Sequence, residues 1–451
     1  MDLNKYNRPV PRYTSYPPAN HFTGDFTGSD YSGLIAESNH KEPSHVAIYI
    51  HIPYCRQMCH YCGCNSCRLD DERRVRQYVD AVRAEISKVC SLLDRSRKVS
   101  QIHFGGGTPN AVDSGYISGI IGLVSGMFGF IDHPEIAVEC NPAYLDRQYL
   151  QELRDAGVNR YSLGIQDFNL QVLRGVNRLP SAMPVGEIID FIREEGKASV
   201  NLDFIYGLPL QTPETFSETI GDAIALRPDR LVTFSYAHVP WVKRNQAILE
   251  KRGLPSPERK MAMFEKAFTM LIDAGYVPVG LDHFVLPGDE LNLALQNNTL
   301  HRNFQGYCTR RTTGQVYAFG VSAISQLAGG YAQNTKDIGR YIKHIAGGRL
   351  ATEKGYILSG TEMTVREIIT RLMCNYYLNM EELAATMQAD VQSVRQLADT
   401  CRLDEYAADG LLEFDDREVK VTEKGKFFIR NIASAFDPAY KPEENKYSRP
   451  V

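Results

Sequence analysis

Half of the ten cysteines lie in one short segment, between Cys55 and Cys67. Within it, Cys55, Cys59 and Cys62 have the spacing C-x₃-C-x₂-C, which lets three thiolates close on one face of a compact loop. Thiolates are soft ligands that select iron–sulfur clusters or zinc. A structural zinc site takes four ligands, commonly from paired hooks, whereas this chain has a single patch. The spacing therefore predicts a [4Fe–4S] cluster with one iron left open to bind a small molecule.

Short apolar, β-branched runs alternate with helical patterns along much of the chain. The predicted strands cover residues 48–52, 102–104, 136–139, 161–165, 200–205 and 231–236. The predicted helices cover residues 75–93, 114–128, 144–156, 184–195, 213–225 and 257–274. This alternation predicts an α/β fold, an incomplete parallel (β/α)6-type barrel, with a doubly wound open sheet as the alternative. Runs at 277–281 and 316–323 could extend or flank the sheet.

The most distinctive residues come near the carboxyl ends of the predicted strands. In chain order they are the cysteines, Gly106 with Gly107 and Thr108, Glu139, Gln166, Asp203 and Ala237. Side chains from many strands converge on that face of a parallel barrel, and active sites collect there. The placement favours the barrel over the open sheet and predicts one site at its rim.

The two ends of the chain differ from the middle. Beyond about residue 345, helical patterns at 364–378 and 391–406 precede a small hairpin at 410–414 and 419–422, which resembles a winged helix. We interpret this part as a lid or scaffold rather than a DNA-binding module. The first residues are polar and rich in Tyr and Pro. We divide the chain into an N-terminal arm over the active site (1–45), a barrel (46–345) and a smaller, mostly helical C-terminal domain (346–451).

Composition excludes several classes of partner. The formal net charge of −4 gives no global field that attracts nucleic acid. The N-terminus shows no apolar run of a secretory signal. The most apolar stretch, 117–131, is too short to span a bilayer and predicts a buried helix. We therefore expect a cytoplasmic monomer with no membrane span and no nucleic-acid partner, whose cysteines are thiols or metal ligands.

The cysteine spacing, followed by Gly105-Gly-Gly-Thr-Pro109 after the second strand, resembles the radical S-adenosylmethionine (SAM) superfamily. The resemblance implies that the amino and carboxylate groups of SAM bind the open iron. It also implies that one electron from the cluster cleaves the sulfonium C–S bond and releases a 5′-deoxyadenosyl radical. The glycines would let the backbone approach the cofactor closely.

Longer segments are similar to the oxygen-independent coproporphyrinogen III oxidases over nearly the whole chain. They include Pro11-Arg-Tyr-Thr-Ser-Tyr-Pro17, His51-Ile-Pro53, Asp203-Phe-Ile-Tyr-Gly-Leu-Pro209, Asp282-His-Phe284 and His301-Arg-Asn-Phe-Gln-Gly-Tyr307. That family converts two propionates of coproporphyrinogen III to vinyl groups, giving protoporphyrinogen IX in haem biosynthesis. The resemblance implies two SAM molecules, coproporphyrinogen III as substrate, and an electron donor and an electron acceptor of unknown identity.

The resemblance also assigns residues to the two cofactor molecules. Contacts to the cluster-bound SAM would come from Tyr49, Gly106, Glu139, Ala237 and Ile324. Contacts to the second SAM would come from Tyr61, Gly107, Thr108, Gln166, Arg178 and Asp203. The residue types agree, since carboxylates accept from ribose hydroxyls or an amino group and an arginine forks onto a carboxylate. We expect Cys64 and Tyr61 to act in turnover rather than to hold the cluster.

Simpler roles remain open for several of these residues. Glu139 and Asp203 could be buried structural acceptors, Gln166 could cap a helix, and Arg178 could form a structural ion pair. The pairs Asp282-His283 and His301-Arg302 could be structural or could contact the substrate. In the arm, Arg8 and Arg12 could pair with propionates. Asn141 stands where the family often has Asp, which leaves the contacts around Glu139 in doubt, and the sequence assigns no role to Cys67.

Two other functions compete with the oxidase. One is a haem-binding chaperone of the same fold, and the other is a radical methyltransferase or haem-opening enzyme that also uses two SAM molecules. Chaperone relatives generally lack Cys64 and the Arg12-Tyr-Thr-Ser-Tyr-Pro17 arm, and both are present here. The methyltransferase relatives are not expected to have the full arm or the segment 301–307.

Overall fold

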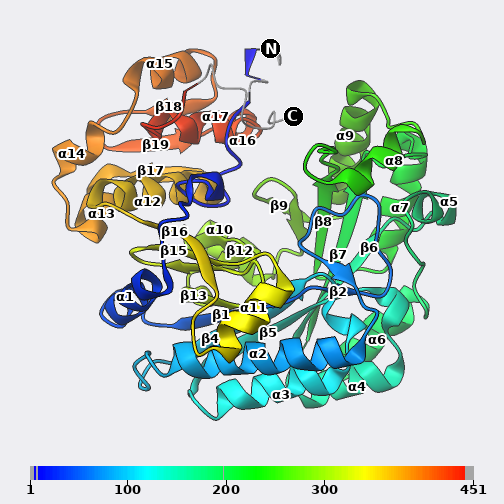
Figure 1. The fold of residues 1–451 in the computed structure, drawn as a ribbon. Coiled ribbons are helices and arrows are strands. Elements are labelled where there is room, and N and C mark those ends of the chain that lie inside the picture. Colours follow the sequence, from blue (N-terminus) through cyan, green and yellow to red (C-terminus); the bar gives the residue numbers. More distant parts are fainter. Residues whose placement is uncertain (1–4, 7–8, 197, 442–451) are drawn as a thin grey trace.

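The computed structural model describes residues 5–6, 9–196 and 198–441, and its main body is one sheet covered by helices (Figure 1). Twelve strands of the described chain form this sheet in the order β16-β15-β14-β13-β1-β4-β5-β6-β7-β8-β10-β9. Its centre consists of six parallel strands: β1 (Val46–Ile52), β4 (Val99–Gly106), β5 (Phe130–Cys140), β6 (Arg160–Gln166), β7 (Ser199–Tyr206) and β8 (Arg230–Ser235). The six predicted strands overlap them in this order. The sheet ends at β16 and β9 without closing, which confirms the incomplete barrel.

The helices that follow the strands lie where the apolar periods predicted them. They are α2 (Glu72–Cys90), α3 (Ser114–Ser125), α4 (Arg147–Asp155), α6 (Val185–Arg193), α7 (Pro213–Ala225) and α9 (Pro257–Asp273). In α2 the residues Val75, Val79, Val82 and Ile86 are buried in the core shared with the sheet. The interpretation of 117–131 as one helix is wrong in its second half. Phe130 pairs with Val99, so this end of the apolar stretch begins β5.

Further strands widen the sheet on both sides. On one side β13 (Gln315–Phe319) pairs parallel with β1, and β14 (Ile324–Leu327), β15 (Gly330–Asn334) and β16 (Thr352–Ile357) follow antiparallel. On the other side β10 (His283–Val285) pairs antiparallel with β8 and with β9 (Val277–Val279). The predicted runs at 277–281 and 316–323 therefore extend the sheet at opposite ends. A separate hairpin consists of β11 (Leu300–Asn303) and β12 (Gly306–Thr309).

The C-terminal part is mostly helical and contains the predicted hairpin. Its elements are α12 (Gly360–Asn375), β17 (Tyr377–Asn379), α13 (Met380–Met387), α14 (Val391–Arg395), α15 (Thr400–Ala408), β18 (Leu412–Phe414), β19 (Glu418–Val421), α16 (Glu423–Lys426) and α17 (Ile429–Ala433). The prediction of one helix over 391–406 is wrong. Asp399 caps α15, and its N–H donates to the carbonyl of Ala435 at 2.9 Å, which ends the preceding helix. The helix predicted to reach 378 ends at Asn375, because Tyr376 adopts a left-handed φ of 57°.

The N-terminal arm packs on both parts of the chain. Tyr6, Tyr13 and Tyr16 are buried in the core of the C-terminal part, and the Tyr13 hydroxyl donates to Asp437 at 2.9 Å. Farther along, α1 (Gly28–Ser38) contacts β14, β15 and β16. The arm therefore joins the barrel to the C-terminal part (Figure 1). Arg8 lies outside the described residues.

No helix in the described part of the chain combines the length and apolar character needed to cross a membrane. The division of the chain at residues 45 and 345 remains a prediction. The main sheet itself continues through β16, up to Ile357.

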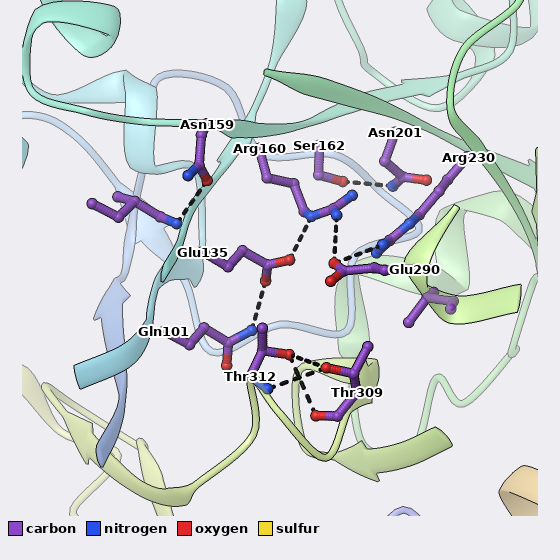
Figure 2. Close-up of polar contacts among 12 residues, drawn as sticks. Gln101, Glu135, Asn159, Arg160, Ser162, Asn201, Arg230, Glu290, Thr309 and Thr312 are labelled. Carbon is purple, nitrogen blue, oxygen red and sulfur yellow. Dashed lines mark hydrogen bonds and ion pairs between the residues drawn. The ribbon is translucent and has the colours of Figure 1, made fainter. Parts of the chain in front are cut away.

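Buried ion pairs fill the amino-terminal end of the barrel, which we call the barrel floor (Glu135, Arg160, Arg230, Asp289 and Glu290; Figure 2). Arg160 lies 2.6 Å from Glu135 and 2.9 Å from Glu290, while Arg230 lies 2.8 Å from Asp289 and 3.1 Å from Glu290. Burial alone would raise the pKa of Glu135, but the charges of Arg160 and Arg230 lower it to about 2. These paired charges close the barrel opposite the rim where the strands end.

Arg230→Met is expected to lower the free energy of unfolding by about 3–5 kcal/mol, because it leaves the buried Asp289 carboxylate without a cation. Arg311→Met is the matched control. Arg311 contacts the same Glu290 at 3.2 Å, but its side chain is 48% exposed. The control should cost less than about 1 kcal/mol. Guanidinium unfolding of the three proteins measures both values, and equal losses would contradict the assigned role of the floor.

Candidate functional site

The cysteine loop lies directly against the glycine segment that follows β4. The two are joined by backbone hydrogen bonds from Gly107 to Ile52 (2.8 Å) and from Thr108 to Tyr54 (3.0 Å). The Sγ atom of Cys55, on β2 (Tyr54–Cys55), lies 3.3 Å from Oγ1 of Thr108. A Cβ atom at Gly107 would lie 2.7 Å from the backbone of Pro53 and 3.1 Å from Sγ of Cys55. Only glycine permits this approach, as the sequence predicted.

Surrounding loops hold the backbone of the cysteine loop. Three side-chain amides donate to its carbonyls: Asn177 to Met58 (2.9 Å), Asn245 to His60 (3.1 Å) and Gln246 to Tyr61 (2.8 Å). Cys67, on β3 (Cys67–Arg68), donates its backbone N–H to Pro53 at 2.8 Å. Cys67 therefore supports the loop through its backbone. These hydrogen bonds hold the loop through its backbone.

The sulfur atoms of Cys59 and Cys62 both accept hydrogen bonds. Arg178 donates to Sγ of Cys59 at 3.6 Å, and the backbone N–H of Cys64 donates to Sγ of Cys62 at 3.4 Å. Hydrogen bonding from Cys64 lowers the pKa of Cys62 to about 6, although burial opposes this. Within the described residues, no three His, Cys, Asp or Glu side chains are grouped to hold one metal ion. A cluster binds each thiolate through a different iron, so its ligands lie farther apart than those of a single ion.

Glu139 lies at the centre of a first group of predicted cofactor contacts. Its carboxylate accepts from the N–H of Gly106 at 3.3 Å and lies 3.0 Å from Nε2 of His103. Gly106 has a φ of +113°, and a Cβ there would lie 2.7 Å from the ring of His51. The Tyr49 hydroxyl lies 3.3 Å from Nδ1 of the same His51. Tyr49, Gly106 and Glu139 are thus neighbours on β1, β4 and β5.

Asn141 does not disturb the contacts around Glu139. It exchanges hydrogen bonds with Asn110, at 2.8 Å and 3.0 Å, and caps a short turn. His51 and His103 were not predicted to be site residues. The available signal was their position near the carboxyl ends of the first two strands.

Arg178 lies at the centre of a second group. It donates to the Tyr61 hydroxyl at 3.2 Å and to the carbonyl of Gly164. No carboxylate of the described residues pairs with it, so the interpretation as a structural ion pair is wrong. Gln166 has a left-handed φ of 72°, and its buried Oε1 has no hydrogen-bond partner among the described residues. Asn169, not Gln166, caps the next helix, α5 (Leu170–Gly175). A buried acceptor of this kind calls for a donor from a ligand.

Asp203 faces the barrel interior beside two polar residues that the sequence analysis missed. Its carboxylate accepts from the Ser162 hydroxyl and from the Asn201 side chain, each at 2.7 Å. Asn201 also donates to Ser162 at 2.8 Å, and Figure 2 shows this pair beside the barrel floor. Burial outweighs these hydrogen bonds and raises the pKa of Asp203 to about 6. Both residues could have been found from the alternation of side chains along β6 and β7.

The remaining predicted residues are Ala237, Ile324 and Cys64. Ala237 is exposed just after β8, and Ile324, at the start of β14, packs beside Phe22 and Tyr331. The carbonyl of Cys64 accepts from Lys243 at 2.7 Å. The assignment of each site residue to a cofactor remains a prediction.

Comparison with known proteins first defines the class. The radical SAM superfamily model matches residues 49–223, and the HemN C-terminal domain model matches residues 358–428. The solved coproporphyrinogen III oxidase (HemN) from Escherichia coli, described as a radical SAM enzyme, aligns with a TM-score of 0.89 and 36% identity. The alignment covers 95% of this chain and 98% of that one. The chain is therefore a radical SAM protein, and its cofactors are a [4Fe–4S] cluster and SAM.

Curated relatives then give the family. The oxygen-independent coproporphyrinogen III oxidase of Synechocystis sp. is 38% identical, over 100% of this chain and 97% of its own length. The proteins of the same name from Salmonella typhimurium and Escherichia coli K12 are both 37% identical, over 100% and 96% of this chain and 97% and 94% of their own lengths. The chain belongs to the oxygen-independent coproporphyrinogen III oxidase family.

Alanine substitution of Cys55, Cys59 or Cys62 is expected to abolish cluster binding, because each removes one of only three protein ligands. Cys64→Ala should retain the cluster, because alanine keeps the backbone N–H that donates to Sγ of Cys62 and removes only the side-chain hydrogen bond between them. Iron content and visible absorption after anaerobic reconstitution measure the outcome. If Cys64→Ala loses iron as completely as Cys59→Ala, the ligand assignment is wrong.

Protonation of Asp203 is expected to stabilise the ligand-free protein at mildly acid pH. Its pKa rises from an ordinary value of 3.8 to about 6 on folding, so the folded state binds the proton more tightly. This contribution grows as pH falls from about 6 to about 4, and reaches roughly 2–3 kcal/mol relative to Asp203→Asn. Unfolding of both proteins between pH 8 and 4 tests it. Parallel stability curves would show that the carboxyl group is not perturbed.

Proposed function

We propose that the protein catalyses the oxygen-independent oxidative decarboxylation of two propionates of coproporphyrinogen III to vinyl groups, giving protoporphyrinogen IX in haem biosynthesis. The observation that carries this proposal is the full-length similarity to oxidases of that name, 38% identical in one case. When bound, the cluster and SAM supply a 5′-deoxyadenosyl radical that abstracts hydrogen from a propionate carbon. Acid–base groups alone do not reach such a C–H bond, because it yields no stabilised carbanion.

Two cofactor positions are supported by the two groups of residues. The first group, around Glu139, lies beside the cysteine loop and offers a carboxylate to the amino group or ribose of the cluster-bound SAM. The second group offers Arg178 for a carboxylate, and Gln166 and Asp203 for donor groups. Ala237 and Ile324 would complete the first position, and Tyr61, Gly107 and Thr108 the second.

Cys64 and Tyr61 would then act on turnover. The N–H of Cys64 donates to Sγ of Cys62, so Cys64 affects the sulfur of a cluster ligand. The Tyr61 hydroxyl accepts from Arg178 and thereby orients this guanidinium. In this arrangement the C-terminal domain and the arm serve as scaffold and cover for the catalytic barrel.

The reaction also needs redox partners. Loss of CO₂ after hydrogen abstraction leaves one electron on each propionate carbon, which must pass to an electron acceptor. A separate donor would supply the electron that the bound cluster needs. We infer a monomer located in the cytoplasm, and the location is supported by the free thiols of all ten cysteines.

The product of anaerobic turnover tests the proposed function. With reductant, SAM, an acceptor and coproporphyrinogen III, the protein should release CO₂, form 5′-deoxyadenosine and yield a tetrapyrrole lighter by two carboxyl groups. Mass spectrometry of the tetrapyrrole is the measurement, and Cys59→Ala is the inactive control. A methylated or ring-opened product would favour the methyltransferase class. Stoichiometric haem retention without any change in substrate mass would favour the chaperone.

A further inference from the structure

Three cations gather beside the open edge of the barrel: Arg12 of the arm, Arg302 of β11, and Lys260 of α9. Arg302 donates to the backbone carbonyl of Arg12 at 3.3 Å, which ties the arm to the hairpin. Lys260 donates to the carbonyl of Tyr236, just after β8, at 2.7 Å. None of the three forms an ion pair with a carboxylate in the described part of the chain. At the barrel floor, by contrast, Arg160 and Arg230 are paired with carboxylates.

Arg302 is built into a packed polar site. Its guanidinium lies 5.2 Å from the ring centre of Tyr307, the residue opposite it in the β11–β12 hairpin. The Nε atom of Arg302 is buried and has no hydrogen-bond partner among the described residues. Tyr307 packs directly on Gly280. A Cβ atom added to Gly280 would lie 1.9 Å from the Tyr307 ring. A buried donor held in this way costs free energy until a ligand supplies an acceptor.

The contact between Arg302 and the Arg12 carbonyl places these two residues side by side, and the charges of the cations shift the pKa values of their neighbours. Burial raises the pKa of Asp282, but the hydrogen bond and charge of His283, then the charges of Arg302 and Arg12, bring it below its ordinary value. Burial lowers the pKa of Lys260, and the charge of Arg12 lowers it further. The Asp282 carboxylate binds His283 at 2.8 Å. Its single negative charge does not balance the three cations, so this edge has a net positive charge.

The cation site adjoins the second cofactor group. Asp203 of β7 and His283 of β10 both pair with Val232 of β8, so all three residues lie at one level of the sheet. Residues directly opposite in adjacent strands point to the same face, here the barrel interior. The His283 ring in turn meets the edge of Tyr307, with ring centres 5.1 Å apart. A ligand carboxylate bound by Arg302 would therefore extend from the open edge toward Asp203.

We propose that Arg12, Arg302 and Lys260 form a carboxylate-binding site for the propionate groups of the porphyrinogen. The site rests on the proposed function for the identity of its ligand. A tetracarboxylate macrocycle brings several anions at once, and arginine forks onto carboxylates with two parallel hydrogen bonds. The amino-acid carboxylate of SAM has the same chemistry, so the test must separate the two sources.

Anaerobic fluorescence titration of the full-length, cluster-loaded protein compares coproporphyrin III with its uncharged tetramethyl ester. Arg302→Gln and Lys260→Gln should each weaken binding of the acid about 10- to 100-fold and leave ester binding unchanged. Arg12→Gln, at an exposed position, should weaken it about threefold. Arg259→Gln, the exposed neighbour of Lys260 on α9, is the matched control and should bind both ligands like the wild type.

Equal losses for acid and ester, or no loss for the acid, would overturn the carboxylate site. Calorimetric titration with SAM separates the sources, because a loss confined to SAM would assign these cations to the cofactor and overturn the proposal as well. Failure of the proposed function has a different signature. In that case the wild type would bind neither porphyrin and would leave coproporphyrinogen III unchanged in the mass assay. If Arg302→Gln does not fold, Lys260→Gln and Arg12→Gln still decide the outcome.

Discussion

The site depends on the pairing of β1 with β4 beyond the end of the sheet. The register that joins Ile52 to Gly106 continues as two more backbone hydrogen bonds, from Gly107 to Ile52 and from Thr108 to Tyr54. Because the cysteine loop begins at this point, the same hydrogen bonds fix the first thiol against Thr108. A side chain at Gly107 would push the two segments apart and move Cys55. The position of Cys55, a predicted cluster ligand, is therefore set by backbone geometry.

The charged groups at the two ends of the barrel have different kinds of partner. At the floor, each buried arginine has carboxylate partners at 2.6–3.1 Å, so the cost of burial is offset locally. At the rim, Asp203 has only neutral donors, Oε1 of Gln166 has no partner among the described residues, and Arg178 pairs with a hydroxyl, a sulfur and a carbonyl. The parallel strands connect these ends, so the ion pairs of the floor, shown in Figure 2, can hold the rim in place.

The sequence was sufficient for features that depend on local pattern. The cysteine spacing, the glycine segment and the order of the six parallel strands all follow from residues close in the chain. Contacts between distant segments were not accessible in this way. Arg160 and Glu290 are 130 positions apart, and Tyr13 and Asp437 are 424 apart, so no periodicity relates them. The break before α15 was also missed because it depends on a distant segment. The N–H of Asp399 donates to the carbonyl of Ala435, near the C-terminal end of the chain. Tertiary hydrogen bonds there overrode an apolar pattern typical of one helix.

Two buried polar atoms without partners among the described residues, Oε1 of Gln166 at the rim and Nε of Arg302 at the open edge, affect which ligands bind. A buried polar atom without a partner costs about 1–3 kcal/mol, and the folded chain bears this cost at Gln166 and Arg302. A ligand that completes these hydrogen bonds recovers the cost as binding free energy, in surroundings where a low dielectric strengthens each contact. A molecule that lacks the matching donor or acceptor recovers none of it. These sites therefore discriminate between ligands because the unpaired atoms destabilise the unliganded protein, and only a ligand with the matching donor or acceptor removes that cost.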